Sequence, residues 1–435
     1  MGAIKVHIHT IGCRANQADS SVLSAHLDPA VATLGEEMDA DVIVINTCCV
    51  TTEAERDCKK TARRLLRQNP NGKVLFTGCA VSAFKSFADE FSGQVLSVGG
   101  GATSPVELAG WLNNWAQEKR ADAALPSTKS RQYDYFASAD APEFQSVANV
   151  AGRTRALLKI QNGCTHHCTY CIVPKARGPE QSMPREMVLQ QVAHMKAGGA
   201  KELVFTGVQI GAWGRDLPGQ PSIAALLDDA ANLFAPGRIR LSSIEPWSVD
   251  EALIEVMASN HRICNHLHMP LQAGDDQVLA DMRRGYTGAQ WLEKVQMAQR
   301  RIPGIAVGTD VICGFPTEDE AAFENTLKII EASKVAYVHG FSYSRRPGTI
   351  AAKKWGDNRE TAKSRVRVLR ALGEKLRLAY LQTVRGTTCE VLVEDPNRGI
   401  TDTFLQVRLV DAPPQTLMSV CVDTCAEAPD SLCAK

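Results

Sequence analysis

Residues 159–178 read KIQNGCTHHCTYCIVPKARG, and Cys164, Cys168 and Cys171 within them form a CxxxCxxC motif. Apolar residues at positions 156, 157, 158 and 160 predict a buried strand that ends just before the motif. Three thiolates on one short loop can hold three irons of a 4Fe-4S cluster and leave the fourth iron without a protein ligand. Zinc is the alternative, but structural zinc sites usually have paired CxxC knuckles and four closed ligands. The motif therefore predicts an iron-sulfur cluster with one iron open to a further ligand.

The overall composition is that of an ordinary globular protein. The chain has 435 residues, of which 44% are hydrophobic and 22% charged, and this length suits two or three domains. Its 48 basic and 48 acidic residues balance, so any RNA-binding surface must be local. The N-terminal sequence MGAIKVHIHTIGC lacks the apolar run of a secretory signal, and no stretch has the roughly 18 apolar residues of a membrane span. We therefore expect a cytoplasmic protein without a membrane segment, whose 14 cysteines are reduced thiols and metal ligands rather than a disulfide framework.

Three further cysteines each follow a predicted strand in the first hundred residues. The strands KVHIHTIGC, DVIVINTC and KVLFTGC end at Cys13, Cys48 and Cys79, with helical sequence between them. This βαβα order predicts a parallel sheet, whose ligands gather beyond the carboxyl ends of the strands. The three cysteines should therefore converge on one edge and hold a second cluster with an open iron. The alternative is three ordinary core cysteines, and the neighbouring Cys49 is expected to point away from the site.

The composition and the strand pattern divide the chain into four segments. Residues 1–117 form an N-terminal cluster domain, residues 118–154 a linker rich in Ala, Ser, Asp and Pro, residues 155–380 the core, and residues 381–435 a small β domain. The core has six strand candidates, which are LLKIQN, ELVFTG, RIRLSS, HLHMP, AVGTDVICGF and YVHGFSYS. Six strands that alternate with helices favour an open, partial (β/α)6 barrel over a closed barrel of eight units. We therefore predict an α/β protein with an open parallel sheet, a partial barrel and a small terminal β-barrel.

Small and polar residues follow the later strands of the predicted barrel. Active sites of barrel folds lie at these strand ends, so the residues there are candidates for binding a cofactor. They are Thr206, Gly207, Val208, Ser243, Glu245, Gln272 and Gly314. The alternative for each of them is ordinary turn chemistry.

Charge is distributed unevenly in the last part of the chain. Residues 353–377 hold nine basic and three acidic residues, a net charge of +6, which could form a face for phosphates or a solvated helix surface. Residues 378–435 hold four basic and eight acidic residues, a net charge of −4, which opposes RNA binding by the terminal domain. Cys421, Cys425 and Cys433 lie near the end without an accompanying histidine and receive no assignment.

Together these motifs resemble the methylthiotransferase family of radical S-adenosylmethionine enzymes. The similarity covers essentially the whole chain: a three-cysteine N-terminal domain, a radical core and a terminal β-barrel of the TRAM type. Five strings most resemble the branch that modifies threonylcarbamoyladenosine in tRNA, namely GCRANQ (12–17), NTCCVT (46–51), RLSSIEPW (240–247), HLHMPLQAGDDQVLADMRR (266–284) and GITDTFLQVRL (399–409). Some positions depart from the family pattern, with Asn162 in place of a common aspartate, GFPTED in place of GFPGET, and GIT in place of GHT. None of these departures removes a cysteine ligand.

The resemblance implies an enzyme that transfers a sulfur-containing group with two 4Fe-4S clusters. The cluster on the CxxxCxxC cysteines would cleave S-adenosylmethionine to a 5′-deoxyadenosyl radical, and the cluster on the three N-terminal cysteines would supply the sulfur. The radical would activate C2 of threonylcarbamoyladenosine beside the anticodon, a carbon without an acidic proton for ordinary acid-base chemistry to remove. The strand-end residues would contact S-adenosylmethionine, with Glu245 and Gln272 at the ribose hydroxyls.

The resemblance also implies partners for the enzyme. The anticodon stem-loop of tRNA would be its substrate, flavodoxin or ferredoxin would be its electron donor, and a monomer is expected. One alternative is methylthiolation of isopentenyladenosine in tRNA or of an aspartate in a ribosomal protein. A second is sulfur insertion into a small molecule, and a third is a non-enzymatic Fe-S or zinc protein that binds RNA.

Overall fold

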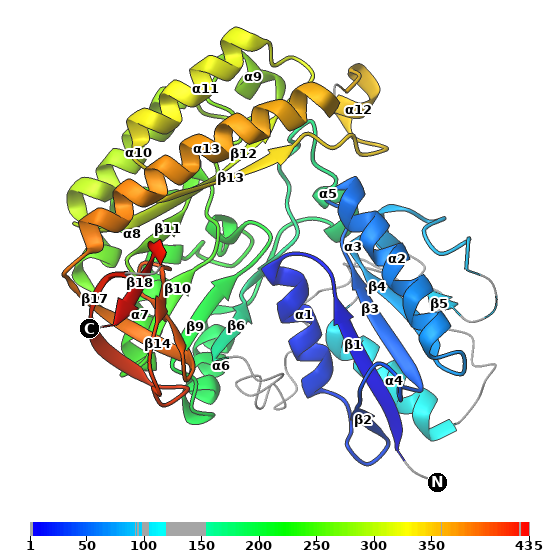
Figure 1. Ribbon diagram of the computed structural model, residues 1–435. Helices are drawn as coiled ribbons and strands as arrows, with labels where there is room; N and C mark the ends of the chain where they lie inside the picture. Colours follow the sequence, from blue (N-terminus) through cyan, green and yellow to red (C-terminus); the bar gives the residue numbers. More distant parts are fainter. Residues whose placement is uncertain are drawn as a thin grey trace.

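Two α/β units and a β-barrel follow one another along the chain (Figure 1). The computed structural model describes residues 3–91, 93, 95–97, 104–118, 154–357, 359–425 and 428–434. The predicted linker therefore lies outside the described residues, apart from Glu118 and Thr154 at its two ends.

The first unit is a five-stranded parallel sheet with the strand order β2-β1-β3-β4-β5. Its strands are β1 (Ile4–Thr10), β2 (Ala32–Leu34), β3 (Val42–Thr47), β4 (Lys73–Gly78) and β5 (Val95–Ser97). Its helices are α1 (Arg14–Ala25), α2 (Thr52–Gln68), α3 (Cys79–Ala83) and α4 (Pro105–Glu118). The central strand β3 is buried along its whole length, as its apolar sequence VIVINT predicts. The predicted parallel sheet is confirmed, while the edge strands β2 and β5 are too short to give a sequence signal.

The second unit is an open barrel of six parallel strands. The strands are β6 (Arg155–Lys159), β9 (Glu202–Thr206), β10 (Arg238–Leu241), β11 (His266–His268), β12 (Ala306–Cys313) and β13 (Tyr337–Ser342). They pair as β6-β9-β10 and as β11-β12-β13, and isolated bridges such as that between Ser243 and His268 join the two halves. The row begins with β6 and ends with β13. These two strands do not pair with each other in the described residues, so the barrel is open. The predicted partial (β/α)6 barrel is confirmed.

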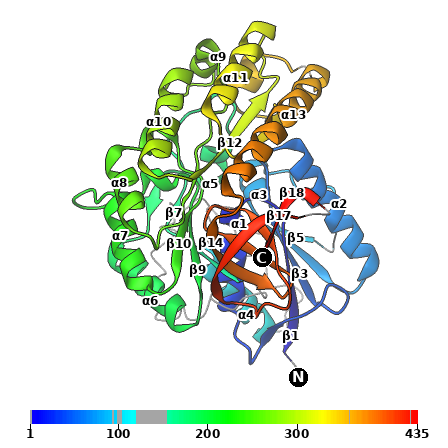
Figure 2. The same cartoon turned by 60° about the vertical axis from the view of Figure 1, so that its left-hand side comes forward.

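Helices cover the outer face of this barrel (Figure 2). The long ones are α6 (Arg185–Ala197), α7 (Ile223–Phe234), α8 (Glu251–Ser259), α10 (Gly288–Arg301), α11 (Glu320–Ser333) and α13 (Arg359–Val384). Shorter elements lie between them, namely β7 (Gln161–Asn162), α5 (Val173–Arg177), β8 (Gln181–Ser182), η3 (Ile210–Ala212), η4 (Pro246–Ser248), α9 (Asp276–Asp281) and α12 (Ile350–Lys354). Side-chain caps start several of the helices, including a capping box of Thr287 and Gln290 at α10. No described helix combines the length and the apolar character needed to cross a bilayer.

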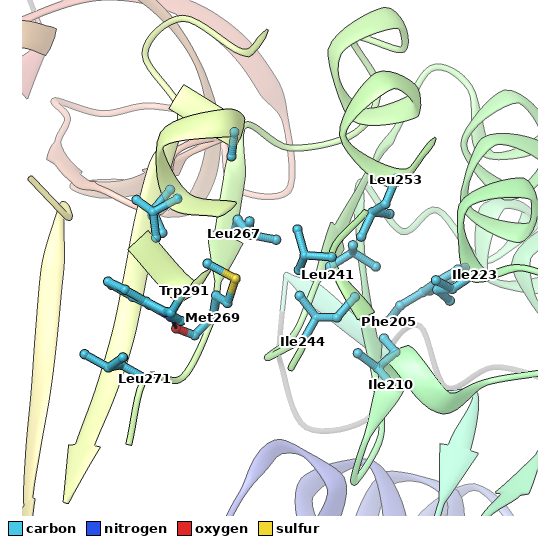
Figure 3. Close-up of a cluster of buried hydrophobic side chains, with 14 of the residues drawn as sticks. Phe205, Ile210, Ile223, Leu241, Ile244, Leu253, Leu267, Met269, Leu271 and Trp291 are labelled. Atoms are coloured by element: carbon cyan, nitrogen blue, oxygen red, sulfur yellow. Dashed lines mark hydrogen bonds between the residues drawn. The ribbon is translucent and has the colours of Figure 1, made fainter. Parts of the chain in front are cut away.

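An apolar core lies between the strands and these helices (Figure 3). Phe205 of β9 and Leu241 of β10 meet side chains from the covering helices, and each is at most 1% exposed. Trp291 of α10 is fully buried, and its indole N–H donates to the carbonyl of Met269 at 3.0 Å. Burying one such large side chain stabilises the fold by about 1.5–3 kcal/mol. The core therefore fixes the strand ends on which the site is built.

The third unit is a closed barrel with the strand order β14-β15-β16-β18-β17. Its strands are β14 (Thr388–Asp395), β15 (Arg398–Thr401), β16 (Gln406–Arg408), β17 (Leu417–Cys425) and β18 (Ala428–Ala434). Its interior is apolar, with Val391, Val407, Val422 and Leu432 at most 1% exposed. The predicted terminal β-barrel is confirmed.

A disulfide bond joins Cys425 to Cys433 between β17 and β18. The two strands are antiparallel neighbours, and the Cα atoms of these cysteines lie 5.2 Å apart, a separation typical of disulfides. The expectation that every cysteine is a reduced thiol is therefore wrong for this pair. The other 12 cysteines, Cys421 among them, are free.

Two buried arginines of β10 attach the terminal barrel to the core. Arg238 and Arg240 flank the carboxylate of Glu202 on β9, with Nε–O distances of 2.7 and 2.8 Å. Their other N–H groups donate to carbonyl oxygens of the terminal barrel. The acceptors are the carbonyls of Glu390, Ile400, Thr401 and Asp402. Burial alone raises the pKa of Glu202, but Arg240 and Arg238 outweigh it and lower that pKa to about 2, so the carboxylate stays ionised between them.

Glu202→Ala should lower the free energy of unfolding by about 3–5 kcal/mol, because it leaves the buried Arg240 without a carboxylate and Arg238 with only the exposed one of Glu390, 3.3 Å away. Urea unfolding followed by circular dichroism measures this loss. Glu255→Ala is the matched control, since Glu255 pairs with Arg301 at the surface, where their side chains are 61% and 65% exposed. That change should alter the unfolding free energy by at most about 1 kcal/mol. Equally small effects of both substitutions would contradict the role of Glu202.

Candidate active site at two cysteine triads

The CxxxCxxC loop starts at Gly163, directly after β7. Gly163 has a φ of +72°, and a Cβ there would lie 1.7 Å from the carbonyl oxygen of Pro179, so only glycine fits. The Cys164 N–H donates to the carbonyl of the residue that follows α5, and the Cys171 N–H donates to the Cys168 carbonyl, both at 3.0 Å. These bonds fold the loop back on itself and leave all three cysteines partly exposed. The loop therefore presents three sulfurs together at the end of β6 and β7.

The chemistry of this loop fits a 4Fe-4S cluster. Burial, together with the nearness of the other thiols, raises the pKa of Cys164 to about 11 and that of Cys171 to about 12. Thiols that oppose one another's ionisation in this way become good ligands once a bound cation compensates their charge. Three soft sulfur donors on one loop suit three irons of such a cluster. These residues fit the predicted catalytic cluster.

The three N-terminal cysteines converge at the carboxyl edge of the first sheet. Cys13 follows β1, Cys48 follows β3, and Cys79 opens α3 after β4. The sulfurs of Cys13 and Cys79 lie 3.5 and 3.9 Å from the same Asn16 Oδ1. Gly12 has a φ of +134°, and a Cβ there would lie 3.0 Å from the Cys48 Cβ, so the first loop passes close to the second. The structure thus brings together the three sulfurs that the sequence places far apart, and they too suit a cluster with one open iron.

Cys49 departs from the expectation that it points away from this site. Its side chain is fully buried, and its thiol hydrogen-bonds to Cys79. Strand β3 ends at Thr47, so the alternation of side chains along it does not extend to Cys49. The shared hydrogen bond raises the pKa of Cys49, and the same bond, assisted by the Arg177 guanidinium, lowers the pKa of Cys79. Cys79 is therefore prepared to act as a thiolate ligand.

Arg177, the last residue of α5, connects the two cysteine triads. Its side chain is buried, and Nε donates to the Cys79 sulfur at 3.2 Å. Nη1 donates to Asn162 Oδ1 at 3.0 Å, beside the start of the CxxxCxxC loop. Nη2 donates to Asn16 Oδ1 at 2.7 Å, and Asn16 in turn touches Cys13. One guanidinium therefore contacts a cysteine of the N-terminal triad and the residue two positions before Cys164.

A partly buried carboxylate balances the charge of this arginine. Asp19 on α1 pairs with Arg177 at 3.1 Å and with Lys159 of β6 at 2.7 Å. Burial lowers the pKa of Lys159 to about 8, although Asp19 opposes that shift. Asp19 already supplies the negative charge that Arg177 needs. A neutral amide at Asn162 is therefore sufficient to accept the hydrogen bond from Arg177. This gives a physical reason for the departure from the family pattern at position 162.

The predicted cofactor-binding turn at residues 206–208 follows β9. Gln161 holds this turn, because its Oε1 accepts from the N–H of Val208 at 3.0 Å and of Gln209 at 2.7 Å. A Cβ at Gly207 would lie 3.0 Å from the Gln161 carbonyl oxygen, which favours glycine there. Thr206 is buried at the end of the strand. The turn is therefore built against β7, directly before the CxxxCxxC loop.

Glu245, another predicted cofactor contact, forms an ion pair with Arg284. The Arg284 guanidinium lies over the Trp247 ring, 4.7 Å from its centroid, and donates to the Cys168 sulfur at 3.4 Å. The structure thus places Glu245 one side chain away from the CxxxCxxC loop. A hydroxyl that bound Glu245 would share its carboxylate with Arg284.

The remaining strand-end candidates have structural roles in the described residues. Ser243 pairs with His268 in the bridge between the barrel halves, and Gln272, with a φ of +69°, pairs with Val311. Gly314 has a φ of +74°, and a Cβ there would lie 2.4 Å from the Ala362 Cβ of α13. A tight turn packed against α13 explains this glycine without a ligand.

The basic segment at residues 353–377 is largely paired with acids. Five of its nine cations form ion pairs, and three of these five have surface-exposed side chains. They are Arg359, Lys363, Arg365, Lys375 and Arg377. The net charge therefore overstates the positive surface that this segment offers to phosphates.

Several residues of the site are absent from the sequence prediction. They are Asn16, Gln161, Arg177 and Arg284. Each lies inside or beside a string that the sequence analysis identifies, such as GCRANQ or ADMRR. Their types give no signal, because an arginine or an amide beside a motif is usually a surface residue.

Comparisons with known proteins agree with this geometry. The family model "Radical SAM superfamily" matches residues 158–330, and the model "Uncharacterized protein family UPF0004" matches residues 5–99. The chain is 32% identical to the threonylcarbamoyladenosine tRNA methylthiotransferase MtaB of Rickettsia prowazekii, over 93% of this chain and 91% of that protein. It is also 32% identical to the MtaB protein of Bacillus subtilis, over 92% of this chain and 89% of that protein. It is 30% identical to the tRNA-2-methylthio-N(6)-dimethylallyladenosine synthase of Aquifex aeolicus, over 91% of this chain and 89% of that protein.

Solved structures share the fold. The radical S-adenosylmethionine methyltransferase TsrM of Kitasatospora setae, with cobalamin and a [4Fe-4S] cluster bound, aligns with a TM-score of 0.57 at 15% identity, over 80% of this chain and 77% of that one. The cobalamin-dependent S-adenosylmethionine radical enzyme OxsB aligns with a TM-score of 0.54 at 11% identity, over 85% of this chain and 57% of that one. These likenesses support the fold of the N-terminal unit and the open barrel.

Arg177→Ala should lower the free energy of unfolding of the cluster-free protein by about 3–5 kcal/mol, because it removes a buried cation from a paired network. Chemical unfolding followed by tryptophan fluorescence measures the change. Arg185→Ala is the control, since Arg185 and its partner Asp229 are 40% and 41% exposed, and its loss should cost at most about 1 kcal/mol. A wild-type unfolding curve for Arg177→Ala would exclude the connecting role.

Proposed function

We propose that this chain, which belongs to the methylthiotransferase family of radical S-adenosylmethionine enzymes, converts N6-threonylcarbamoyladenosine beside the anticodon of tRNA to the 2-methylthio derivative. Family membership follows from about 32% identity over more than nine tenths of the chain. All of these relatives support the more general activity, that of a tRNA methylthiotransferase.

The observation that carries this proposal is the meeting of two cysteine triads. Cys164, Cys168 and Cys171 form one triad and Cys13, Cys48 and Cys79 the other, and Arg177 contacts both Cys79 and the amide of Asn162, close before the CxxxCxxC loop. A single open cluster would suffice to cleave S-adenosylmethionine. A second open cluster beside it is what a sulfur transfer requires, because an open iron can hold the sulfur that is transferred.

The residues of the chain would divide the work as follows. Cys164, Cys168 and Cys171 would hold the cluster that, with S-adenosylmethionine, supplies the radical chemistry needed at an aromatic carbon. The turn at residues 206–208 offers backbone groups, fixed by Gln161, to the amino acid end of the cofactor. The buried contact of Arg177 with Cys79 keeps the two triads in a fixed relation. No group with a tuned pKa is needed to remove the C2 hydrogen, since that hydrogen is not acidic.

The choice of adenosine modification is the finer part of the proposal. The two 32% identical relatives named above carry the threonylcarbamoyladenosine name, and the strings GCRANQ and GITDTFLQVRL resemble that branch. We further propose that a reduced flavodoxin or ferredoxin delivers the electron and that the enzyme acts in the cytoplasm as a monomer. Modification of dimethylallyladenosine is the second candidate, because relatives with that name are 30–31% identical.

Anaerobic iron and sulfide analysis should give about eight irons per reconstituted wild-type chain, and about four in each of two triple alanine variants. One variant replaces Cys164, Cys168 and Cys171, and the other replaces Cys13, Cys48 and Cys79. Full iron content in the second variant would leave the N-terminal cysteines structural and would contradict the proposed sulfur transfer.

Cys168→Ala should abolish cleavage of S-adenosylmethionine, while Cys48→Ala should preserve cleavage and abolish transfer of the thiomethyl group. Mass spectrometry of nucleosides from treated tRNA measures the 2-methylthio derivative, and chromatography measures 5′-deoxyadenosine. Cys389→Ala, in the terminal barrel, is the control and should retain both activities within about twofold of wild type. Thiomethylation by Cys48→Ala would remove the two-cluster mechanism. If the wild-type enzyme formed the 2-methylthio derivative only on dimethylallyladenosine, the proposed substrate would be wrong but the two-cluster mechanism would stand.

A further inference from the structure

A cavity lies where the three units of the molecule meet. Its volume is about 380 Å³. Its walls come from α1, from the strands β6 and β9, and from the terminal barrel. The lining includes Arg14, Gln17, Arg155, Val204, Arg398 and Phe404. Arg14 is the residue next to Cys13, so the cavity adjoins the cysteine triad proposed to supply the sulfur.

The cavity has more positive than negative groups. Arg155 pairs with Glu394 at 3.0 Å, and Arg398 lies 3.2 Å from Asp395 and 3.8 Å from Glu394. Arg14 makes neither an ion pair nor a hydrogen bond with any residue in the described part of the chain. Its guanidinium lies over the Phe404 ring, 5.2 Å from the centroid. A partly buried cation without an anion is costly, so this position is suited to a ligand that brings a negative charge.

More cations surround the same aromatic ring. Arg155 and Arg240 lie 5.6 and 5.2 Å from the Phe404 centroid. Arg240 has its carboxylate in Glu202, and Arg155 has Glu394. Arg14 alone of these three guanidiniums has no carboxylate partner within the described ranges. It is therefore the group free to bind an anion in the cavity.

The two candidate substrates differ in the charge of the group on N6. Threonylcarbamoyl ends in a carboxylate, whereas dimethylallyl is an uncharged hydrocarbon. In the adenine ring, C2 and the carbon that bears N6 flank the same nitrogen, so the N6 group lies close to the reacting carbon. An anion-binding group beside the sulfur-supplying triad is therefore placed to read that carboxylate.

We propose that Arg14 binds the carboxylate of the threonylcarbamoyl group and thereby selects this substrate over dimethylallyladenosine. The inference rests on the proposed function, because it assumes that C2 of the adenosine reacts beside Cys13. Phe404 forms the wall that holds the guanidinium in place. Arg14 and Phe404 belong to GCRANQ and GITDTFLQVRL, two of the strings that resemble the threonylcarbamoyladenosine branch.

The test compares three anticodon stem-loop RNAs with the reconstituted enzyme. They carry threonylcarbamoyladenosine, its methyl ester, which lacks the charge and is larger by one methyl group, and dimethylallyladenosine. The variants are Arg14→Gln, Arg14→Lys and, as a control at an exposed arginine, Arg301→Gln, whose side chain is 65% exposed. The readouts are kcat/KM for the 2-methylthio product and the dissociation constant of each RNA by fluorescence anisotropy.

Wild type should prefer the acid over its ester by about 10- to 100-fold in kcat/KM, as expected for a charge-assisted hydrogen bond. Arg14→Gln should lose that preference, because its kcat/KM should fall for the acid and not for the ester. Arg14→Lys should retain part of the preference, and Arg301→Gln should match wild type. The dissociation constants should follow the same order.

Two outcomes would overturn the inference about Arg14 and leave the proposed function intact. One is an equal loss on the acid and the ester in Arg14→Gln, which would assign Arg14 a structural role beside Cys13. The other is a wild-type enzyme that uses acid and ester equally well. A wild-type enzyme that modifies only dimethylallyladenosine would instead remove the proposed function, and with it the inference. The ester comparison thus separates the two failures.

Discussion

The buried guanidinium of Arg177 is the contact on which the arrangement of this molecule depends. It joins a loop of the open barrel to the edge of the N-terminal sheet, with Asp19 as its counter-charge. Breaking such a pair inside a protein leaves a charge that nothing compensates, so the network acts as a unit. The two cysteine triads keep their relative position because this cation connects their loops. A reaction that needs a radical and a sulfur at the same carbon requires that kind of fixed geometry.

The sequence predicts the parts of this molecule that repeat a local pattern. Apolar strands followed by cysteines reveal the parallel sheet, the six strands of the open barrel and the cysteines of both triads. It does not reveal Arg177 or Arg284, since their partners are distant in the chain and a single arginine has no periodicity. It misplaces Cys49, because β3 ends at Thr47 and the alternation of a strand no longer applies. The disulfide between Cys425 and Cys433 likewise depends on a strand pairing that spacing alone does not give.

The terminal barrel resolves an apparent conflict between its charge and a role in RNA modification. Its attachment to the core uses backbone carbonyls, which accept from Arg238 and Arg240, so the acidic side chains are not needed for docking. Its contribution to the cavity includes an aromatic ring, that of Phe404. The guanidiniums stacked near that ring come from α1 and from the core. A barrel with a net charge of −4 can therefore take part in binding an anion that the other units hold.

The position of Phe404 also has a consequence for the order of events during synthesis of the protein. The cavity combines Arg14, near the start of the chain, with a residue that the ribosome adds almost 400 positions later. The core and the N-terminal sheet can fold and acquire their clusters before the last strands emerge, since domains generally fold as units during translation. The wall against the guanidinium is complete only after the terminal barrel has closed. A nascent chain could therefore carry both clusters and still be unable to position a modified adenosine, which would delay its activity until the whole polypeptide has left the ribosome.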